Sequence, residues 1–189
     1  MASQVNTSLP LFRYHPDPLE TCSIKHSDAV CVVCGKARGY IYPGPPYGGE
    51  EYVEEICPWC IADGSAHRLL AVEFTDPLDI GTSSANWNSV RIPDAVQEEI
   101  AYRTPGIRSW QSASWLGHCG DAAAYLGPVG YNELEAFGFE AIEAIRGSTG
   151  LEGDEWWDFC LRLDKYGSPT GYIFRCIHCG AYAGYTDCD

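Results

Sequence analysis

The sequence predicts a mixed α+β fold, and three observations lead to this prediction. Short segments rich in tyrosine, valine and isoleucine, which favour strands, lie in the first third of the chain and again near its C-terminus. The middle of the chain instead has apolar residues at helical spacing. A cysteine pair of the form C-x-x-C occurs three times, twice in the first third and once near the end. A chain of 189 residues can hold this pattern in one domain, which we expect to span 1–189.

The first two cysteine pairs, Cys31/Cys34 and Cys57/Cys60, have the spacing of a structural zinc site. Cytosolic thiols are kept reduced, so ten cysteines without a signal peptide indicate metal ligands rather than disulfides. Zinc binds four thiolates in a tetrahedron, and two intervening residues let one turn supply two of them. Gly35 can take the positive φ that turns backbone N–H groups toward the sulfurs. Unrelated buried thiols or a redox pair are the alternative interpretations.

The residues around these pairs predict an N-terminal zinc module over 31–72. Segments 40–42 and 52–56 have strand composition, and the turn-forming segment 43–49 separates them. A helix is expected after the second pair, although Gly64 weakens its pattern. The order of knuckle, hairpin and helix resembles the treble-clef arrangement of zinc modules, in which the first turn of the helix supplies the second cysteine pair.

The middle of the chain, 93–163, is predicted to be a mainly helical region. Helices are expected at 93–102, at 131–147 and at 153–163, each with start or stop residues near its ends. Segments 171–176 and 181–186 then predict a C-terminal knuckle hairpin within 170–188. A two-stranded hairpin is marginal alone, so we expect it to pack on the main body.

The third cysteine pair, Cys176/Cys179, repeats the first knuckle, as CIHCG repeats CVVCG. No fourth pair follows, so any further ligands of a second zinc site must come from elsewhere. His118 and Cys119 are the best candidates; adjacent residues usually point apart, so one of them, or both if the backbone bends sharply, could contribute. An unmetallated remnant of a duplicated knuckle is the alternative. The substitutes considered are Cys22, His26, Cys160 and Cys188.

The net charge and the hydropathy of the chain indicate which kinds of molecule it can bind. The chain has 12 Lys and Arg against 26 Asp and Glu, a net charge of −14, which repels nucleic acid and anionic membranes and attracts basic proteins. The N-terminus lacks the basic and apolar regions of a signal peptide, and no run approaches the roughly 20 apolar residues of a membrane-spanning helix. We therefore expect a cytoplasmic protein without a nucleic-acid or membrane partner.

Several segments carry a family resemblance. They are LPLFRYHPDPLET at 9–21, CVVCG at 31–35, CPWCIADGSAH at 57–67, RTPGIRSWQSASWLGHCGDAAAYLG at 103–127 and CIHCG at 176–180. Together they resemble the CbrC family of bacterial proteins, whose named member is associated with tolerance to a nuclease colicin. The resemblance implies a role as an immunity protein of a toxin system.

An acidic protein fits that implied role, because nuclease toxins bind a polyanion and present basic surfaces. We expect a zinc-binding protein that neutralises such a toxin by direct contact. An adaptor for another basic protein and a metal-dependent enzyme using His118, Cys119 and Asp121 are the alternatives, although catalysis is not expected. Two acidic groups are candidate contact surfaces, with a solvated face as the alternative for each: Glu50, Glu51, Glu54 and Glu55, and Glu152, Asp154, Glu155 and Asp158.

Overall fold

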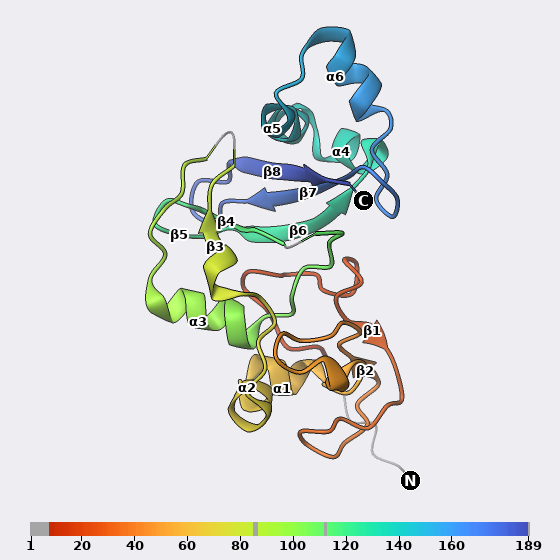
Figure 1. Cartoon of the computed structure of the whole chain (residues 1–189), viewed down its shortest axis with the longest axis vertical. Coiled ribbons are helices and arrows are strands. Elements are labelled where there is room, and N and C mark those ends of the chain that lie inside the picture. The colour runs from red at the N-terminus through yellow and green to blue at the C-terminus, as the bar shows by residue number, and fades with distance from the viewer. Residues whose placement is uncertain (1–7, 85–86, 112, 189) are drawn as a thin grey trace.

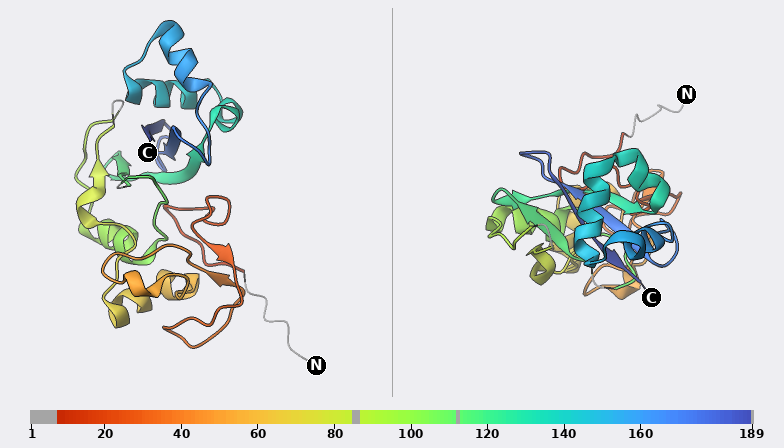
Figure 2. Two further views of the ribbon diagram at one scale, coloured as in Figure 1. Left: turned by 45° about the vertical axis from the view of Figure 1, so that its right-hand side comes forward. Right: turned by 90° about the horizontal axis from the view of Figure 1, so that it is seen from above.

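The computed structural model describes residues 8–84, 87–111 and 113–188. Figure 1 shows an elongated molecule in which the N-terminal third forms one end and helix α6 the opposite end. Two sheets lie between these ends, and the left view of Figure 2 shows the same order of parts. Among the described residues, no helix combines the length and apolar character that crossing a bilayer requires.

The N-terminal part contains a two-stranded sheet, a 3-10 helix and two short helices. The elements are β1 (Lys25–His26), β2 (Tyr40–Ile41), η1 (Glu50–Tyr52), α1 (Pro58–Ala62) and α2 (Ser65–Leu70). The expected helix is split because Gly64 takes a φ of 73°. Three fully buried isoleucines and the buried cysteines share one apolar core here: Ile41, Ile56, Ile61, Cys31, Cys57 and Cys60.

The hairpin expected between the first two cysteine pairs is not formed. Strand β2 pairs with β1 in antiparallel fashion rather than with 52–56. The 52–56 segment begins at the end of η1 and continues as a turn in which Glu54 has a φ of 60°, a conformation that an extended strand excludes. Only Ile56 forms a bridge to Tyr42. The Glu55 carbonyl instead accepts a hydrogen bond of 2.9 Å from the Val32 N–H, which ties the turn to the first knuckle.

The central part holds a small sheet of strands β3, β4 and β5 and helix α3. Strand β3 runs parallel to β4, and β4 pairs antiparallel with β5. Helix α3 confirms the helix expected at 93–102, and it contacts α1 and α2 of the N-terminal part. The bounds are η2 (Pro77–Asp79), β3 (Ile80–Thr82), α3 (Asp94–Arg103), β4 (Trp115–His118) and β5 (Asp121–Ala122).

The C-terminal part is an antiparallel sheet in the order β6-β7-β8, covered on one side by helices. Helix α5 packs so closely on the sheet that a Cβ at Gly184 would lie 2.5 Å from Cδ1 of Ile145. The helix expected at 131–147 is split at Gly138, whose φ is 92°. The bounds are β6 (Ala124–Val129), α4 (Tyr131–Phe137), α5 (Phe139–Thr149), α6 (Gly153–Cys160), β7 (Thr170–Arg175) and β8 (Tyr182–Asp187).

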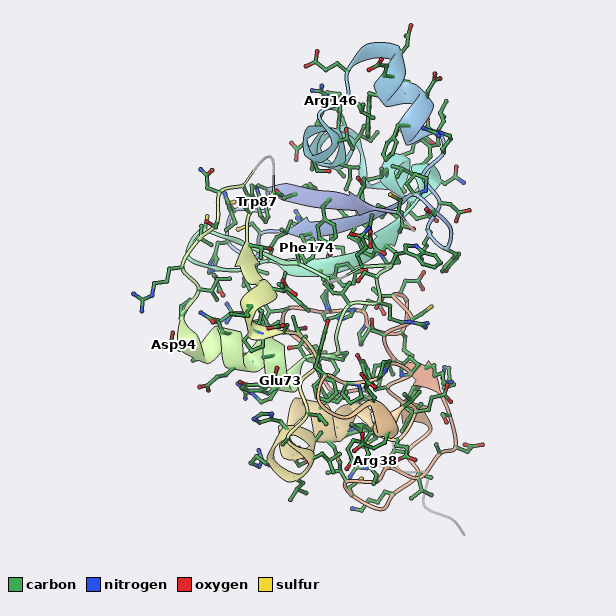
Figure 3. All side chains as sticks on the ribbon, in the orientation of Figure 1. Arg38, Glu73, Trp87, Asp94, Arg146 and Phe174 are labelled. Carbon is green, nitrogen blue, oxygen red and sulfur yellow. The ribbon has the colours of Figure 1, made fainter. Side chains whose placement is uncertain are left out.

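The strands β4, β5 and β6 lie within 93–163, for which helices were the main expectation. Strand β6 pairs with β7 and so extends the predicted C-terminal hairpin of β7 and β8 into a three-stranded sheet. An aromatic core joins the two sheets through Trp115, Tyr125 and Phe174, and Figure 3 labels Phe174 within the C-terminal sheet. This core positions the β4–β5 turn beside the last knuckle.

Candidate metal centres

The described part of the chain contains two groups of side chains that could each hold a metal ion. The buried cluster consists of Cys31, Cys34, Cys57 and Cys60. The exposed cluster consists of His118, Cys119, Cys176 and Cys179. In each cluster the four ligand atoms all lie within 4.8 Å of one another. The structure therefore brings together both ligand sets that the sequence proposed, including both members of the adjacent pair at 118–119.

Three of the six sulfur separations in the buried cluster match the edge of a tetrahedron around zinc. Cys57 Sγ lies 3.8 Å from Cys34 Sγ and 3.6 Å from Cys60 Sγ. Cys60 Sγ in turn lies 3.8 Å from Cys31 Sγ. Four sulfurs at about 2.3 Å from a central zinc ion are separated by about 3.8 Å, since the edge of a tetrahedron is about 1.63 times its radius. The pocket between these sulfurs thus has the size of a zinc ion.

Local structure explains how the buried cluster is assembled. Cys31 and Cys34 come from a turn closed by the Val30–Ala37 bridge. Cys57 is the N-cap residue of α1, and Pro58 occupies the first helical turn, where its missing N–H costs nothing. The Cys57 N–H donates a hydrogen bond of 3.3 Å to Cys31 Sγ. The helix start therefore holds the second pair against the first.

The contacts among the sulfurs favour the deprotonated, thiolate form of Cys31 in the buried cluster. The hydrogen bond from the Cys57 thiol lowers the pKa of Cys31 to about 4, outweighing burial. Burial raises the pKa of Cys60 to about 11, and the hydrogen bond to Cys31 and burial raise the pKa of Cys57. At neutral pH one ligand is thus ready to bind a cation, and metal binding must release the protons of the others.

The exposed cluster depends on a tight turn between β4 and β5. His118 pairs with Asp121 across the hairpin, so the loop consists of Cys119 and Gly120 alone. Their φ angles are 53° and 73°, the two positive values of a type I′ turn. This bend lets both adjacent residues face one point, because His118 Nδ1 lies 3.3 Å from Cys119 Sγ and 3.4 Å from Cys179 Sγ.

An indole ring supports the histidine of the exposed cluster. Trp87, labelled in Figure 3, stacks on the His118 ring at a centroid distance of 4.6 Å and an angle of 22°. Trp87 itself is 5 % exposed. The sequence offered no signal for this contact, because Trp87 lies far from both ligand pairs along the chain and follows no motif.

The two knuckles share one backbone conformation. The Cys31 N–H donates to the Lys36 carbonyl at 3.0 Å, and the Gly35 N–H donates to the Cys31 carbonyl at 2.8 Å. Near the C-terminus the pattern is the same. The Cys176 N–H donates to the Ala181 carbonyl at 2.8 Å, and the Gly180 N–H donates to the Cys176 carbonyl at 3.0 Å. Gly35 and Gly180 have φ values of 66° and 78°. The repeated sequence is therefore a repeated structure.

The pKa of Cys176 is lowered to about 6 in this arrangement. Burial acts to raise it, but the backbone N–H groups of Cys179 and His178 and the side chains of His118 and Cys179 together outweigh burial. Cys176 is the buried member of its cluster, whereas Cys119 and Cys179 are exposed. A cation bound here would thus be reachable from solvent on the side of those two sulfurs.

Asp121 lies beside the exposed cluster but its carboxylate is engaged elsewhere. Oδ1 accepts hydrogen bonds of 2.8 Å from the Tyr14 hydroxyl and from the Ala122 N–H. Oδ2 is 3.1 Å from Nη2 of Arg13 and 2.9 Å from Nε2 of His178. Burial raises its pKa, yet these bonds more than compensate and the net direction is downward. Asp121 thus joins the N-terminal segment to the last knuckle, and four donors leave it little capacity as a catalytic base.

Sequence reasoning singled out Asp121 for chemistry and missed its three side-chain partners, Arg13, Tyr14 and His178. The first two belong to RYH in segment 9–21, and His178 is the third residue of CIHC. None of the substitute ligands joins either cluster within the described residues. Cys160 is the last residue of α6 and is buried in the C-terminal apolar core, and Cys22 and Cys188 are exposed. The His26 ring contacts the Tyr40 ring at a tilted angle in the N-terminal sheet.

Both acidic groups lie on the surface. The η1 patch contains Glu50, Glu51, Glu54 and Glu55, all exposed. Glu54 in this patch forms an ion pair with Lys25. The α6 patch contains Glu152, Asp154, Glu155 and Asp158, also all exposed. No ion pair in the described residues engages an α6-patch carboxylate, and Trp157 and Leu161 are 48 % and 60 % exposed on the same helix or just after it.

Comparison with known proteins gives a family without an assigned activity. No solved structure matches the chain significantly. The UPF0167 protein Mb2317 of Mycobacterium bovis is 44 % identical over 184 residues, covering 95 % of this chain and 93 % of its own. The UPF0167 protein PA1536 of Pseudomonas aeruginosa is 38 % identical over 180 residues, with 93 % and 95 % covered. Residues 9–188 match the model of the uncharacterised protein family UPF0167, and the chain belongs to that family.

Proposed function

We propose that both clusters bind zinc and that the zinc-bound protein neutralises a basic, nuclease-type bacterial toxin by direct contact. The sulfur separations of the buried cluster support the zinc part, as does the three-thiolate, one-imidazole donor set of the exposed cluster. Four protein ligands leave no coordination position for a substrate, which favours a structural role for both ions. The buried cluster would then be a treble-clef variant in which η1 replaces the second strand.

The α6 patch carries the partner part of the proposal. Acidic residues in a first helical turn also stabilise the helix itself, so their presence alone needs no partner. A half-exposed tryptophan among them has no such explanation, and tryptophan is the residue type most enriched at binding hot spots. Unpaired carboxylates around Trp157 would steer a basic protein to this face and let the indole anchor it.

The resemblance to the CbrC family, whose named member is associated with tolerance to a nuclease colicin, supports a nuclease as that basic protein. The net charge of −14 favours association with the cationic surface that a nuclease uses for its polyanionic substrate. A reducing compartment such as the cytoplasm, where a nuclease toxin would act, also keeps the proposed ligands as thiols and thiolates. An adaptor for a different basic protein would use the same face.

Metal content tests the first part. Protein purified without chelator or affinity nickel should contain two zinc ions per chain by elemental analysis, and Cys176→Ser/Cys179→Ser should contain one. One zinc ion in both proteins would leave the buried cluster as the metal site and remove zinc from the exposed cluster. Absence of zinc from both would overturn the zinc proposal.

Calorimetric titration with the isolated cytotoxic domain of a nuclease colicin tests the second part. Asp154→Lys/Asp158→Lys should weaken binding at least tenfold and reduce its salt dependence. The matched control is Glu50→Lys/Glu51→Lys, which makes the same charge change in the η1 patch and should change affinity much less. Equal weakening by both variants would point to net charge rather than the α6 patch. Binding of a non-nuclease basic protein in preference would favour the adaptor alternative.

A further inference from the structure

A cavity that shares no residue with either cluster lies where three segments meet the C-terminal sheet. Its volume is about 320 Å³, at the lower end of the range for small-molecule sites. The turn before β1, the loop after α3 and the loop before β7 supply most of its wall. None of its lining residues belongs to the buried or the exposed cluster.

The charge of this cavity is opposite to that of the protein. Its ten lining residues include two of the chain's 12 Lys and Arg and none of its 26 Asp and Glu. Arg108 is exposed there, and within the described residues no ion pair or hydrogen bond engages its guanidinium. Because Arg108 also lines the cavity, its guanidinium is available to bind an anion there.

The second cation of the cavity is held in place at its edge. The Lys165 side chain is 13 % exposed, and its Nζ lies 3.3 Å from Oε1 of Glu20. The Glu20 side chain is 74 % exposed and lies outside the cavity lining, so an incoming anion can replace it without leaving a buried charge unpaired. Arg108 and Lys165 together can therefore surround one anionic group.

Aromatic rings form the remaining wall. Trp110 is fixed by a hydrogen bond of 2.9 Å from its Nε1 to the Gly167 carbonyl. Tyr166 follows Lys165 directly, and its ring lies 5.4 Å from the lysine Nζ. Tyr172 closes the inner side from strand β7 and is 2 % exposed. Three rings beside two cations suit a ligand that is flat and negatively charged.

We propose that this cavity binds a small aromatic anion, a ring that carries a carboxylate or a phosphate. Arg108 and Lys165 hold the anionic group, and Trp110 and Tyr166 contact the ring. The two cations supply a local positive potential where the rest of the surface repels free anions. This activity is independent of the toxin partner, because the α6 patch contributes no residue to the cavity.

Calorimetric titration of the full-length, zinc-loaded protein with 2-naphthoate tests the ring and the charge separately. We expect 2-naphthoate to bind and 2-naphthamide, the same ring without the charge, to bind at least tenfold more weakly. Acetate, the charge without the ring, should not bind detectably. Phenyl phosphate in a parallel titration distinguishes a phosphate from a carboxylate as the preferred anion. Equal binding of naphthoate and naphthamide, or no binding of either aromatic anion, overturns the proposal.

Two further measurements locate the binding. Arg108→Gln should weaken 2-naphthoate at least tenfold, whereas Arg91→Gln, which removes another exposed arginine without a described partner, should leave it unchanged. Saturating 2-naphthoate should also slow alkylation of Cys22, which lines the cavity, and not that of Cys188, which is exposed outside it. Equal effects of the two arginine variants, or unchanged alkylation of Cys22, would place the ligand elsewhere and overturn the assignment.

Discussion

The buried and exposed clusters begin with the same knuckle and end in different surroundings. The buried cluster receives its second pair from the start of α1 and lies inside an apolar core with Ile41, Ile56 and Ile61. The exposed cluster receives its second pair from the β4–β5 turn and leaves two sulfurs exposed. The same C-x-x-C-G sequence thus forms the same local turn in both clusters, whereas the residues that complete each cluster decide whether the site belongs to a core.

The first test of this comparison removes one ligand from each cluster. Cys57→Ser should lower the free energy of unfolding by about 4 kcal/mol or more, because the buried cluster and the N-terminal core form together. Cys179→Ser should lower it by only about 1–2 kcal/mol, since that sulfur is exposed. Chemical denaturation in zinc-containing buffer measures both, with Cys188→Ser as the control outside the clusters. Equal losses would remove the distinction between the clusters.

The second test uses His15, which is fully buried in the core that carries the exposed cluster. Its Nδ1 donates to the Pro105 carbonyl at 2.8 Å, so Nε2 accepts from the Thr21 hydroxyl at 2.7 Å. Burial lowers its pKa to about 4 from an ordinary 6.5. The neutral ring is thus favoured by folding, and its stabilisation is complete above pH 6.5 and declines as the pH falls toward 4.

The expected loss of stability across that pH range is about 3 kcal/mol, because burial lowers the pKa of His15 from 6.5 to about 4. In His15→Gln, denaturation midpoints should fall less over the same range, while protonation of metal ligands affects both proteins alike. The signal of the central core should show the difference more than that of the N-terminal part. Parallel pH profiles for the two proteins would contradict the assigned role of His15.

The third test compares how fast each cluster gives up its metal. A colorimetric zinc chelator should remove zinc in two phases, and the fast phase should be at least tenfold faster because solvent reaches Cys119 and Cys179 directly. Cys179→Ser should eliminate the fast phase and retain the slow one. A single phase, or loss of the fast phase in Cys57→Ser instead, would reverse the comparison.

The smallest expected effect on stability comes from replacing the matching glycine in each knuckle. Gly35→Ala and Gly180→Ala each place a side chain at positive φ, which costs about 1 kcal/mol. A Cβ at Gly35 would meet nothing within 4 Å, and one at Gly180 would only approach the Arg175 side chain at 3.4 Å, so strain in φ is the common cost. Thermal denaturation should show similar shifts for both, and a much larger shift at either position would mean that the knuckles are not equivalent.

The sequence predicted those features that depend on local chemistry. The C-x-x-C pairs identified six of the eight cluster residues, and scarcity of histidine pointed to His118 and its neighbour Cys119. Helix α3 and the pair β7 and β8 followed from residue spacing and composition. Glycines at positive φ divided two predicted helices, at Gly64 and Gly138, where spacing alone suggested continuity.

Long-range pairing produced the features that the sequence did not reveal. Strand β2 takes its partner from Lys25–His26, upstream of the knuckle, because the turn at Glu54 removes the downstream candidate. Strand β6 contains Gly127 and Pro128, which weaken its strand signal, yet its pairing with β7 defines the C-terminal sheet. The engagement of Asp121 by Arg13 depends on residues 108 positions apart, which no local pattern can encode.

The positions of the ligands along the chain determine which cluster can be completed first during synthesis. All ligands of the buried cluster lie within 31–60, and its widest sulfur contact spans 29 positions, so metal could fill it while most of the chain is still being made. The exposed cluster joins His118 to Cys179, 61 positions later, so it cannot form until that later segment has been made. Metal supply early in synthesis would therefore decide the first cluster, and metal supply at a later stage the second.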